Sequence, residues 1–152
     1  VEHRCEYLGE FRSVHCYDSS IDTTPARTAA TLSAFPAPVT VLAGGRNKNL
    51  PLAPLADALR RHAAAVVFFG EAGEEMRAAL LGAGADGGTT PPSRYIADFS
   101  EAVSAALDAT PTGGTLVLTP AAASLDAFRS YRERAETYKR LLYRLAGKTY
   151  TE

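Results

Sequence analysis

Hydrophobic and polar positions follow two spacings in turn along the chain, which predicts alternating strands and helices. Two short apolar runs without polar alternation, Pro38–Ala43 and Ala65–Gly70, indicate strands that are buried on both faces of a parallel sheet. The segment between them repeats apolar residues at helical spacing, namely Leu52, Leu55, Ala56 and Leu59. Strands that alternate in this way with helices of about ten residues predict an α/β domain, with a mostly parallel sheet flanked by helices.

Local signals set the expected limits of the other elements. We expect a helix from Pro25 to about Ala34, since proline suits the first helical position and Thr24 is a good N-cap. Pro36 then biases Phe35 away from helix. The other expected helices are Glu71–Leu81, Phe99–Leu107 and Ser124 to about Ala146, with a surface loop at Gly82–Ser93. The other expected strands are Arg94–Ala97, Thr115–Leu118 and an N-terminal antiparallel hairpin of His3–Gly9 with Ser13–Tyr17.

Composition limits the class of protein. The 152 residues suit one domain, and contents of 46% hydrophobic and 22% charged residues exclude a disordered or fibrous chain. A net charge of −1 provides no attraction for nucleic acid or an anionic membrane. No apolar run approaches the roughly 20 residues that span a bilayer. The opening sequence VEHRCEYLGE also carries charges where a signal peptide would be apolar. We therefore expect neither a nucleic-acid partner nor a membrane partner.

The cysteines and histidines give no sign of a metal site. Cys5 and Cys16 lie in neighbouring strand-like segments, so a disulfide between them is conceivable. Nothing in the sequence indicates an oxidising compartment, so we favour free thiols. The two cysteines and the three histidines, His3, His15 and His62, lack the paired spacing of metal ligands. We expect no bound metal in this chain.

Candidate binding residues lie in the loops that follow the predicted strands, because ligands of open α/β sheets bind beyond the carboxyl ends of strands. Three such loops are polar or rich in glycine: Asp18–Thr24, Gly44–Asn49 and Thr119–Ser124. In the second loop, Gly44 and Gly45 permit a close approach of the backbone, and Lys48 can hold a carboxylate or phosphate. A solvated turn is the alternative interpretation of that loop.

The third loop leads into the predicted final helix. Ser124 can cap this helix, and a helix N-terminus attracts anions, so Ser124 and the backbone at Leu125 can bind a substrate carboxylate. A simple helix cap is the alternative. The apolar residues at helical spacing are expected to pack in the core, namely Phe128, Tyr131, Ala135, Tyr138, Leu142 and Leu145. The basic residues are expected on a solvated face, namely Arg129, Arg132, Arg134, Lys139 and Arg140.

Four segments resemble, in the same order, the C-terminal domain of the Mur ligases, in particular that of the D-glutamate-adding member. Residues 3–6 (HRCE) resemble the family's H-R-x-E segment. Residues 17–28 (YDSSIDTTPART) are similar to its D-S-K-A-T-N-P loop, in the variant where P-x-R-T follows. Residues 42–48 (LAGGRNK) match (I/L)-(A/G)-G-G-x-x-K, and residues 118–139 resemble L-S-P-A-x-A-S-x-D-x-F-x-x-F-x-x-R-G-x-x-F.

The resemblance implies a Rossmann-like domain, often compared with dihydrofolate reductase, from a monomeric three-domain enzyme of the cytoplasm. The UDP-binding domain and the central P-loop ATPase domain would lie outside residues 1–152. The implied activity is the addition of D-glutamate to UDP-N-acetylmuramoyl-L-alanine in peptidoglycan synthesis, with ATP and Mg²⁺. ATP would phosphorylate the alanine carboxylate, and the amine of D-glutamate would attack the acyl phosphate.

No P-loop is present in this chain. The segment Gly147-Lys148-Thr149 follows a predicted helix, and no glycine stands five residues before it. We therefore expect the chain alone to be inactive and to bind none of these ligands tightly.

The resemblance also assigns site residues. The positions that match D-glutamate contacts are Thr23, Lys48, Ser124, Leu125 and Tyr131. The positions that match residues near ATP are His3, Arg4, Asp18 and Ser19.

The first loop departs from the family pattern. The family's Asp-Ser-Lys reads Ser19-Ser20-Ile21 without gaps, so its carboxylate and its lysine are missing. Asp18 can replace the carboxylate. Arg27 is our candidate for the replacing cation, with a plain surface arginine as the alternative.

Two other functions remain open. One is another amino-acid-adding ligase of the Mur or folylpolyglutamate type, against which the P-A-x-A-S-x-D-x-F segment at 120–128 argues. The other is a non-catalytic Rossmann-like binding module, which a P-loop upstream of this chain would exclude.

Overall fold

A computed structural model describes residues 2–47, 49–83, 89–125 and 127–150. Its centre is a six-stranded sheet in the order β1-β2-β6-β3-β4-β5. The strands are β1 (Glu6–Phe11), β2 (Val14–Asp18), β3 (Val39–Gly44), β4 (Ala63–Phe69), β5 (Ser93–Tyr95) and β6 (Thr115–Leu118). The helices are α1 (Pro25–Ser33), α2 (Ala53–His62), α3 (Gly73–Ala83), α4 (Phe99–Ala109) and α5 (Tyr131–Leu145).

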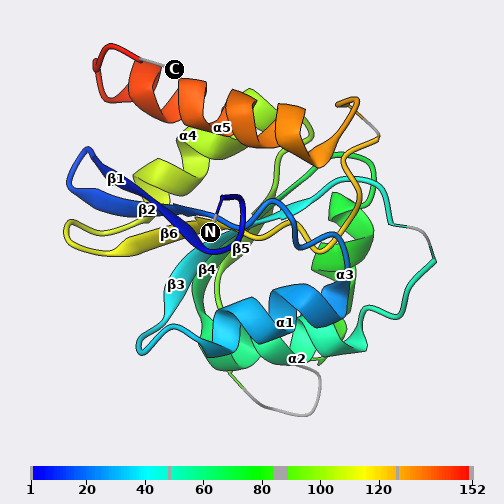
Figure 1. The fold of residues 1–152 in the computed structure, drawn as a ribbon. Helices are drawn as coiled ribbons and strands as arrows, with labels where there is room; N and C mark the ends of the chain where they lie inside the picture. Colours follow the sequence, from blue (N-terminus) through cyan, green and yellow to red (C-terminus); the bar gives the residue numbers. More distant parts are fainter. Residues whose placement is uncertain (1, 48, 84–88, 126, 151–152) are drawn as a thin grey trace.

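The pairing of the strands confirms the predicted fold class. β1 and β2 form an antiparallel hairpin, and β2-β6, β6-β3, β3-β4 and β4-β5 are all parallel pairs. Helices cover both faces of the sheet, with α4 and α5 on one side and α1, α2 and α3 on the other (Figure 1). None of the helices in the described residues is both long enough and apolar enough to cross a membrane.

The sheet separates two hydrophobic cores, and β3 contributes to both. Leu42 packs in the core beneath α4 and α5, whereas Val41 and Ala43 pack in the core beneath α1, α2 and α3. All six residues of β3 are buried. Successive side chains of a strand point to opposite faces, so a central strand covered on both sides needs an unbroken apolar run.

The start of α1 follows its local sequence signals. Thr24 has an extended backbone, and its Oγ1 accepts the backbone N–H of Arg27 at 3.2 Å. Pro25 lies at the beginning of the helix, where its missing N–H costs nothing. The prediction of a helix from Pro25 is confirmed, and the helix ends at Ser33, one residue before the predicted limit.

The start of the final helix was predicted wrongly. α5 begins at Tyr131, with Ser130 as its N-cap, and not at Ser124. The Ser130 hydroxyl accepts the N–H of Glu133 at 3.2 Å. Ser124 lies in an irregular segment instead: Ala123, just before it, pairs with Arg46 in an isolated β-bridge, and Ala121 has a φ of 63°.

The N-terminal strand also begins later than predicted. β1 starts at Glu6 instead of His3, because His3 and Cys5 both have positive φ angles, of 63° and 47°. These angles fold residues 2–5 into a hook that carries His3 back over the end of β2. The hook places a residue from the start of the chain among the loops of the candidate site.

Candidate functional site

The three loops chosen from the sequence meet at one edge of the sheet. They follow β2, β6 and β3, which are neighbours in the sheet and parallel to one another. Backbone hydrogen bonds join them: Ser19 N–H donates to Leu118 O at 2.8 Å and Ala121 N–H donates to Asp22 O at 3.0 Å. Gly44 N–H donates to Pro120 O at 2.9 Å. These three loops therefore form a single cluster in the structure.

Gly44, the last residue of β3, and Gly45, which follows it, allow the backbone to pack closely against β4 and the β6 loop. A Cβ at Gly44 would lie 2.0 Å from Phe69 O, and a Cβ at Gly45 would lie 2.2 Å from Ala123 O. Both residues also have positive φ, which side chains disfavour. The next residue, Arg46, exchanges two backbone hydrogen bonds with Ala123, of 2.8 and 3.0 Å. A side chain at position 44 would collide with β4, and one at position 45 would separate the β3 loop from the β6 loop.

A buried carboxylate that the sequence did not single out braces the first loop. The side chain of Asp22 accepts the hydroxyl of Thr119 at 2.8 Å and that of Thr31 at 2.6 Å. Thr119 is completely buried, and Asp22 is 3% exposed. This network links the β2 loop, the β6 loop and α1. In the sequence, the only signal for Asp22 was its position in the loop after a predicted strand. Its hydrogen bonds could not be predicted, because its hydroxyl partners belong to other segments of the chain.

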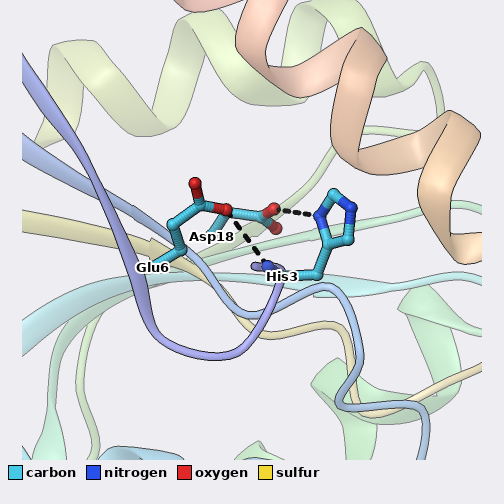
Figure 2. A group of neighbouring side chains, drawn as sticks. All are labelled: His3, Glu6 and Asp18. Carbon is cyan, nitrogen blue, oxygen red and sulfur yellow. Dashed lines mark hydrogen bonds and ion pairs between the residues drawn. The ribbon is translucent and has the colours of Figure 1, made fainter. Parts of the chain in front are cut away.

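His3 and Asp18, which are buried, form a second cluster with the half-buried Glu6 (Figure 2). The Nδ1 of His3 lies 2.9 Å from the Oδ2 of Asp18, and the backbone N–H of His3 donates to Glu6 Oε1 at 3.1 Å. The other Asp18 oxygen, Oδ1, accepts both the backbone N–H and the hydroxyl of Ser20. His3 also meets the ring of Tyr131 edge-on, with 5.9 Å between centroids.

This cluster contains the ligand types of a metal site, which the spacing of histidines and cysteines did not predict. One ligand atom from each of the three residues lies within 4.8 Å of the others. The hydrogen-bond donors already present disfavour a Mg²⁺ site, because both Asp18 oxygens accept hydrogen bonds and Lys139 Nζ lies 3.7 Å from Glu6 Oε1. Mg²⁺ also prefers oxygen ligands over imidazole. The arrangement fits a hydrogen-bonded support for the hook better than a cation site.

The other residues assigned to the ATP side differ in exposure. Ser19 is completely buried, and its hydroxyl accepts the N–H of Cys5 at 3.1 Å. Arg4 is exposed on the hook. The structure thus brings His3, Asp18 and Ser19 together and leaves the guanidinium of Arg4 open to solvent.

The residues assigned to D-glutamate lie on all three loops. Thr23 is half-buried after β2, and Ser124 is 3% exposed at the end of the β6 loop. Leu125 is 50% exposed, and Tyr131 is half-buried at the start of α5. Lys48 lies outside the described residues. The prediction that Ser124 caps the final helix is wrong, so an anion at Ser124 would not benefit from the dipole of α5.

Arg27, the candidate replacement for the family's lysine, is exposed in the first turn of α1. Ile21, which stands at the lysine position, is half-buried, and its N–H donates to His3 O at 3.2 Å. The hook therefore packs against the same loop from which the lysine is missing.

The expected solvated face of the final helix contains one error. Arg129, Arg132 and Arg140 are exposed and Lys139 is half-buried, but Arg134 is completely buried. Its guanidinium donates to backbone carbonyls of the candidate site. Of the residues expected in the core, Ala135, Tyr138 and Leu142 are buried.

The two cysteines are free thiols, as predicted. Burial raises the pKa of Cys16 to about 12, and burial followed by the charge of Asp22 raises the pKa of Cys5. A raised pKa keeps a thiol protonated and unreactive, so neither cysteine is suited to act as a nucleophile.

A surface hollow of about 540 Å³ lies between β1 and α5. Its lining contains no residue of the three loops and consists of Glu6, Tyr7, Leu8, Glu136, Lys139, Arg140, Tyr143 and Tyr150. Its charged groups pair with one another or with its aromatic rings, as in Tyr150–Glu136 and Arg140 over the Tyr150 ring. The loop cluster remains the candidate site because it gathers groups from several elements at the carboxyl ends of the strands.

Comparison with known proteins identifies a matching family and similar enzymes. The family described as Mur ligase, glutamate ligase domain, matches residues 3–123. The UDP-N-acetylmuramoylalanine–D-glutamate ligase of Symbiobacterium thermophilum is 35% identical over 146 residues, which are 96% of this chain and 31% of that protein. The ligase of the same name from Clostridium perfringens is 36% identical over 142 residues, which are 93% of this chain and 31% of that protein.

Solved structures show the same fold in more distant proteins. A Mycobacterium tuberculosis folylpolyglutamate synthase complexed with ADP superposes with a TM-score of 0.62 at 15% identity. The match covers 91% of this chain and 32% of that one. At this identity the likeness concerns the fold alone. The chain spans about a third of the length of the Symbiobacterium thermophilum and Clostridium perfringens ligases.

Proposed function

Because the chain belongs to the Mur ligase family, as its glutamate ligase domain, we propose that it supplies the D-glutamate site of a UDP-N-acetylmuramoylalanine–D-glutamate ligase. The family match confirms the resemblance seen in the sequence. The observation that carries the proposal is the convergence of the β2, β3 and β6 loops, which bear the residues that resemble the family's D-glutamate contacts. The UDP-sugar site and the ATPase site would belong to parts of the enzyme outside this chain.

The proposed reaction forms an amide through an acyl phosphate. ATP phosphorylates the terminal alanine carboxylate of UDP-N-acetylmuramoyl-L-alanine, and the amine of D-glutamate attacks the activated carbonyl carbon. The tetrahedral intermediate then expels phosphate. The contribution of this domain is to hold D-glutamate so that its amine meets the acyl phosphate, which replaces a bimolecular encounter with a fixed approach.

The loops offer suitable donors for the two carboxylates of D-glutamate. We assign the Ser124 hydroxyl, the backbone at Leu125 and the Lys48 ammonium to these carboxylates. Thr23, on the loop after β2, is assigned as a further contact of D-glutamate. Tyr131 would pack against the carbon chain of the amino acid. Charge-assisted hydrogen bonds are short and strong, so a few of them suffice to orient a small anion.

The hook and the end of β2 are proposed to face the nucleotide. Arg4 is exposed and able to reach a phosphate, while His3, Asp18 and Ser19 hold the backbone of the hook beside it. Mg²⁺ would accompany ATP and neutralise charge on its phosphates. The carboxylates of Asp18 and Glu6, which lie nearest the hook, already have donors, so we assign the Mg²⁺ ligands to the ATPase domain.

The cellular setting follows from the same assignment. We propose a monomeric enzyme of the cytoplasm that acts in peptidoglycan synthesis, and hence in cell shape and division. The chain by itself is expected to hydrolyse no ATP, because it contributes no P-loop to cradle the phosphates. ATPase activity that persists in the rigorously repurified chain would refute this part of the proposal.

A ligase for a different amino acid is the second candidate. The folylpolyglutamate synthase shares the fold at 15% identity, whereas the ligases of Symbiobacterium thermophilum and Clostridium perfringens, at 35% and 36% identity, carry the D-glutamate name. The closer sequence relation favours D-glutamate. A non-catalytic binding module would require the full-length protein to lack a P-loop.

The decisive experiment measures amino-acid specificity in the full-length protein. Purified enzyme is supplied with ATP, UDP-N-acetylmuramoyl-L-alanine and D-glutamate, L-glutamate or meso-diaminopimelate, and the release of phosphate is recorded. We expect turnover with D-glutamate alone. Turnover with another of these amino acids would favour the second candidate, and no turnover with any of them would refute the proposed D-glutamate activity.

A further inference from the structure

Arg134 is a charged residue in a position where the helix pattern predicts a solvated one. It lies in the first turn of α5, three residues after Tyr131, and its side chain is completely buried. Arginine is rarely buried unless its N–H groups find acceptors, because a guanidinium loses its hydration on burial. The acceptors that it meets therefore indicate what the residue does.

The guanidinium joins the three loops of the candidate site through their backbones. Its Nη2 donates to Ala122 O at 3.1 Å, in the loop after β6, and to Ser20 O at 3.5 Å, in the loop after β2. Its Nη1 donates to Gly44 O at 3.5 Å, at the end of β3. These strands are the adjacent trio β2-β6-β3. One planar group thus contacts the carboxyl ends of all three.

The contact depends on glycine in the facing loop. A Cβ at Gly45 would lie 3.0 Å from Arg134 Nη1, so a side chain there would press on the guanidinium. The geometry also requires arginine. Its rigid fork presents five N–H donors in a plane, whereas lysine has one nitrogen on a flexible stem and cannot contact three separated carbonyls equally well.

We propose that Arg134 is a positioning residue, which holds the β2, β3 and β6 loops in the register that the D-glutamate site needs. This inference rests on the proposed function for the identity of the ligand. The residues assigned to D-glutamate on these loops are close in sequence to the carbonyls that Arg134 binds. Thr23 lies three residues after Ser20, and Ser124 lies two residues after Ala122. Arg134 itself is buried behind the loops and acts through them.

Two variants and a control in the full-length enzyme test the proposal. Arg134→Lys keeps the charge and the aliphatic stem, and Arg134→Met keeps only the stem. Arg144→Lys makes the same exchange at an exposed position of the same helix. We expect both Arg134 variants to raise KM for D-glutamate at least about tenfold, while KM for ATP changes less than about threefold. Arg144→Lys is expected to change neither.

Hydrogen exchange of backbone amides provides a readout that does not depend on the ligand. Peptides that cover residues 19–24, 44–47 and 119–124 should exchange faster in both Arg134 variants than in the wild type. Peptides from β4 and α2, which contain none of the three carbonyls that Arg134 binds, should be unchanged. If Arg134→Met does not fold, the lysine variant decides alone.

Three results would overturn the positioning role: unchanged exchange in the loops, faster exchange spread evenly over the domain, or an unfolded Arg134→Lys protein. Equal increases in both KM values would also contradict it. Failure of the proposed function has a different signature. In that case the loops would exchange faster in the variants, while D-glutamate would be no substrate even for the wild type.

Discussion

The imidazole of His3 and the carboxylate of Asp18 lie 2.9 Å apart, and this contact fastens the N-terminal hook to the end of β2. Asp18 is completely buried and His3 is 5% exposed, so the pair is shielded from water. The remaining oxygen of Asp18 accepts two donors from Ser20 in the first loop. Through one carboxylate, the start of the chain and the first loop of the candidate site are held together.

We predict that Asp18→Asn destabilises the chain by about 1–3 kcal/mol, because the amide places a donor where an oxygen now faces a donor. Urea unfolding of both proteins measures the loss. Asp108→Asn is the matched control, since Asp108 forms an exposed pair with Arg12 and should change stability by less than about 1 kcal/mol. Equal losses in the two variants would contradict a special role for the buried pair.

In the full-length enzyme, Ser124→Ala and Lys48→Ala should each raise KM for D-glutamate by roughly ten- to a hundredfold. Each change removes a charge-assisted contact worth about 1.5–3 kcal/mol. KM for ATP should change much less. Steady-state kinetics with each substrate varied in turn provides the measurement, and similar changes in both KM values would remove these residues from the amino-acid site.

Arg27 is predicted to supply the positive charge that the family's lysine would provide at Ile21. In the full-length enzyme, Arg27→Ala should lower kcat/KM at least about tenfold, because a guanidinium binds a carboxylate or phosphate bidentately. The melting temperature should hardly change, since Arg27 is exposed. Adding Ile21→Lys should restore part of the activity. Unaltered kinetics for Arg27→Ala would show that it is a plain surface arginine.

The raised pKa of Cys16 predicts a loss of stability in alkaline solution. Burial raises this pKa from 9.0 to about 12 in the folded chain, so the folded state holds its proton more tightly than the unfolded state. The resulting stabilisation is complete below about pH 9 and is lost as the pH rises towards 12. The slope contributed by this single thiol is at most about 1.4 kcal/mol per pH unit.

Urea unfolding between pH 8 and pH 10.5, roughly the range in which the unfolded thiol titrates, tests this prediction. Cys16→Ala should lower stability at every pH but lose less with rising pH than the wild type. Cys5→Ala should keep most of the wild-type slope. Parallel curves for the wild type and Cys16→Ala would show that this thiol does not account for the pH dependence.

Much of the fold follows from local patterns in the sequence. The unbroken apolar runs predicted β3 and β4, and Thr24 with Pro25 predicted the start of α1, because strand burial and helix capping depend on residues close together in the chain. The start of α5 was also marked locally, since Ser130 is followed three residues later by Glu133. Ser124 was preferred because it follows a run of small residues and can also cap a helix, and that choice moved the predicted start seven residues too early.

The sequence by itself determined the α/β class, the N-terminal hairpin and the loops that meet at the candidate site. Only the tertiary structure decided that Arg134 is buried, because the carbonyls that it binds in Gly44 and Ser20 lie 90 and 114 residues away along the chain. The same holds for Asp22, whose partner Thr119 is 97 residues distant. Helical periodicity gives the direction of a side chain around its own helix. Whether that direction meets water or the backbone of three loops depends on how the strands are ordered in the sheet.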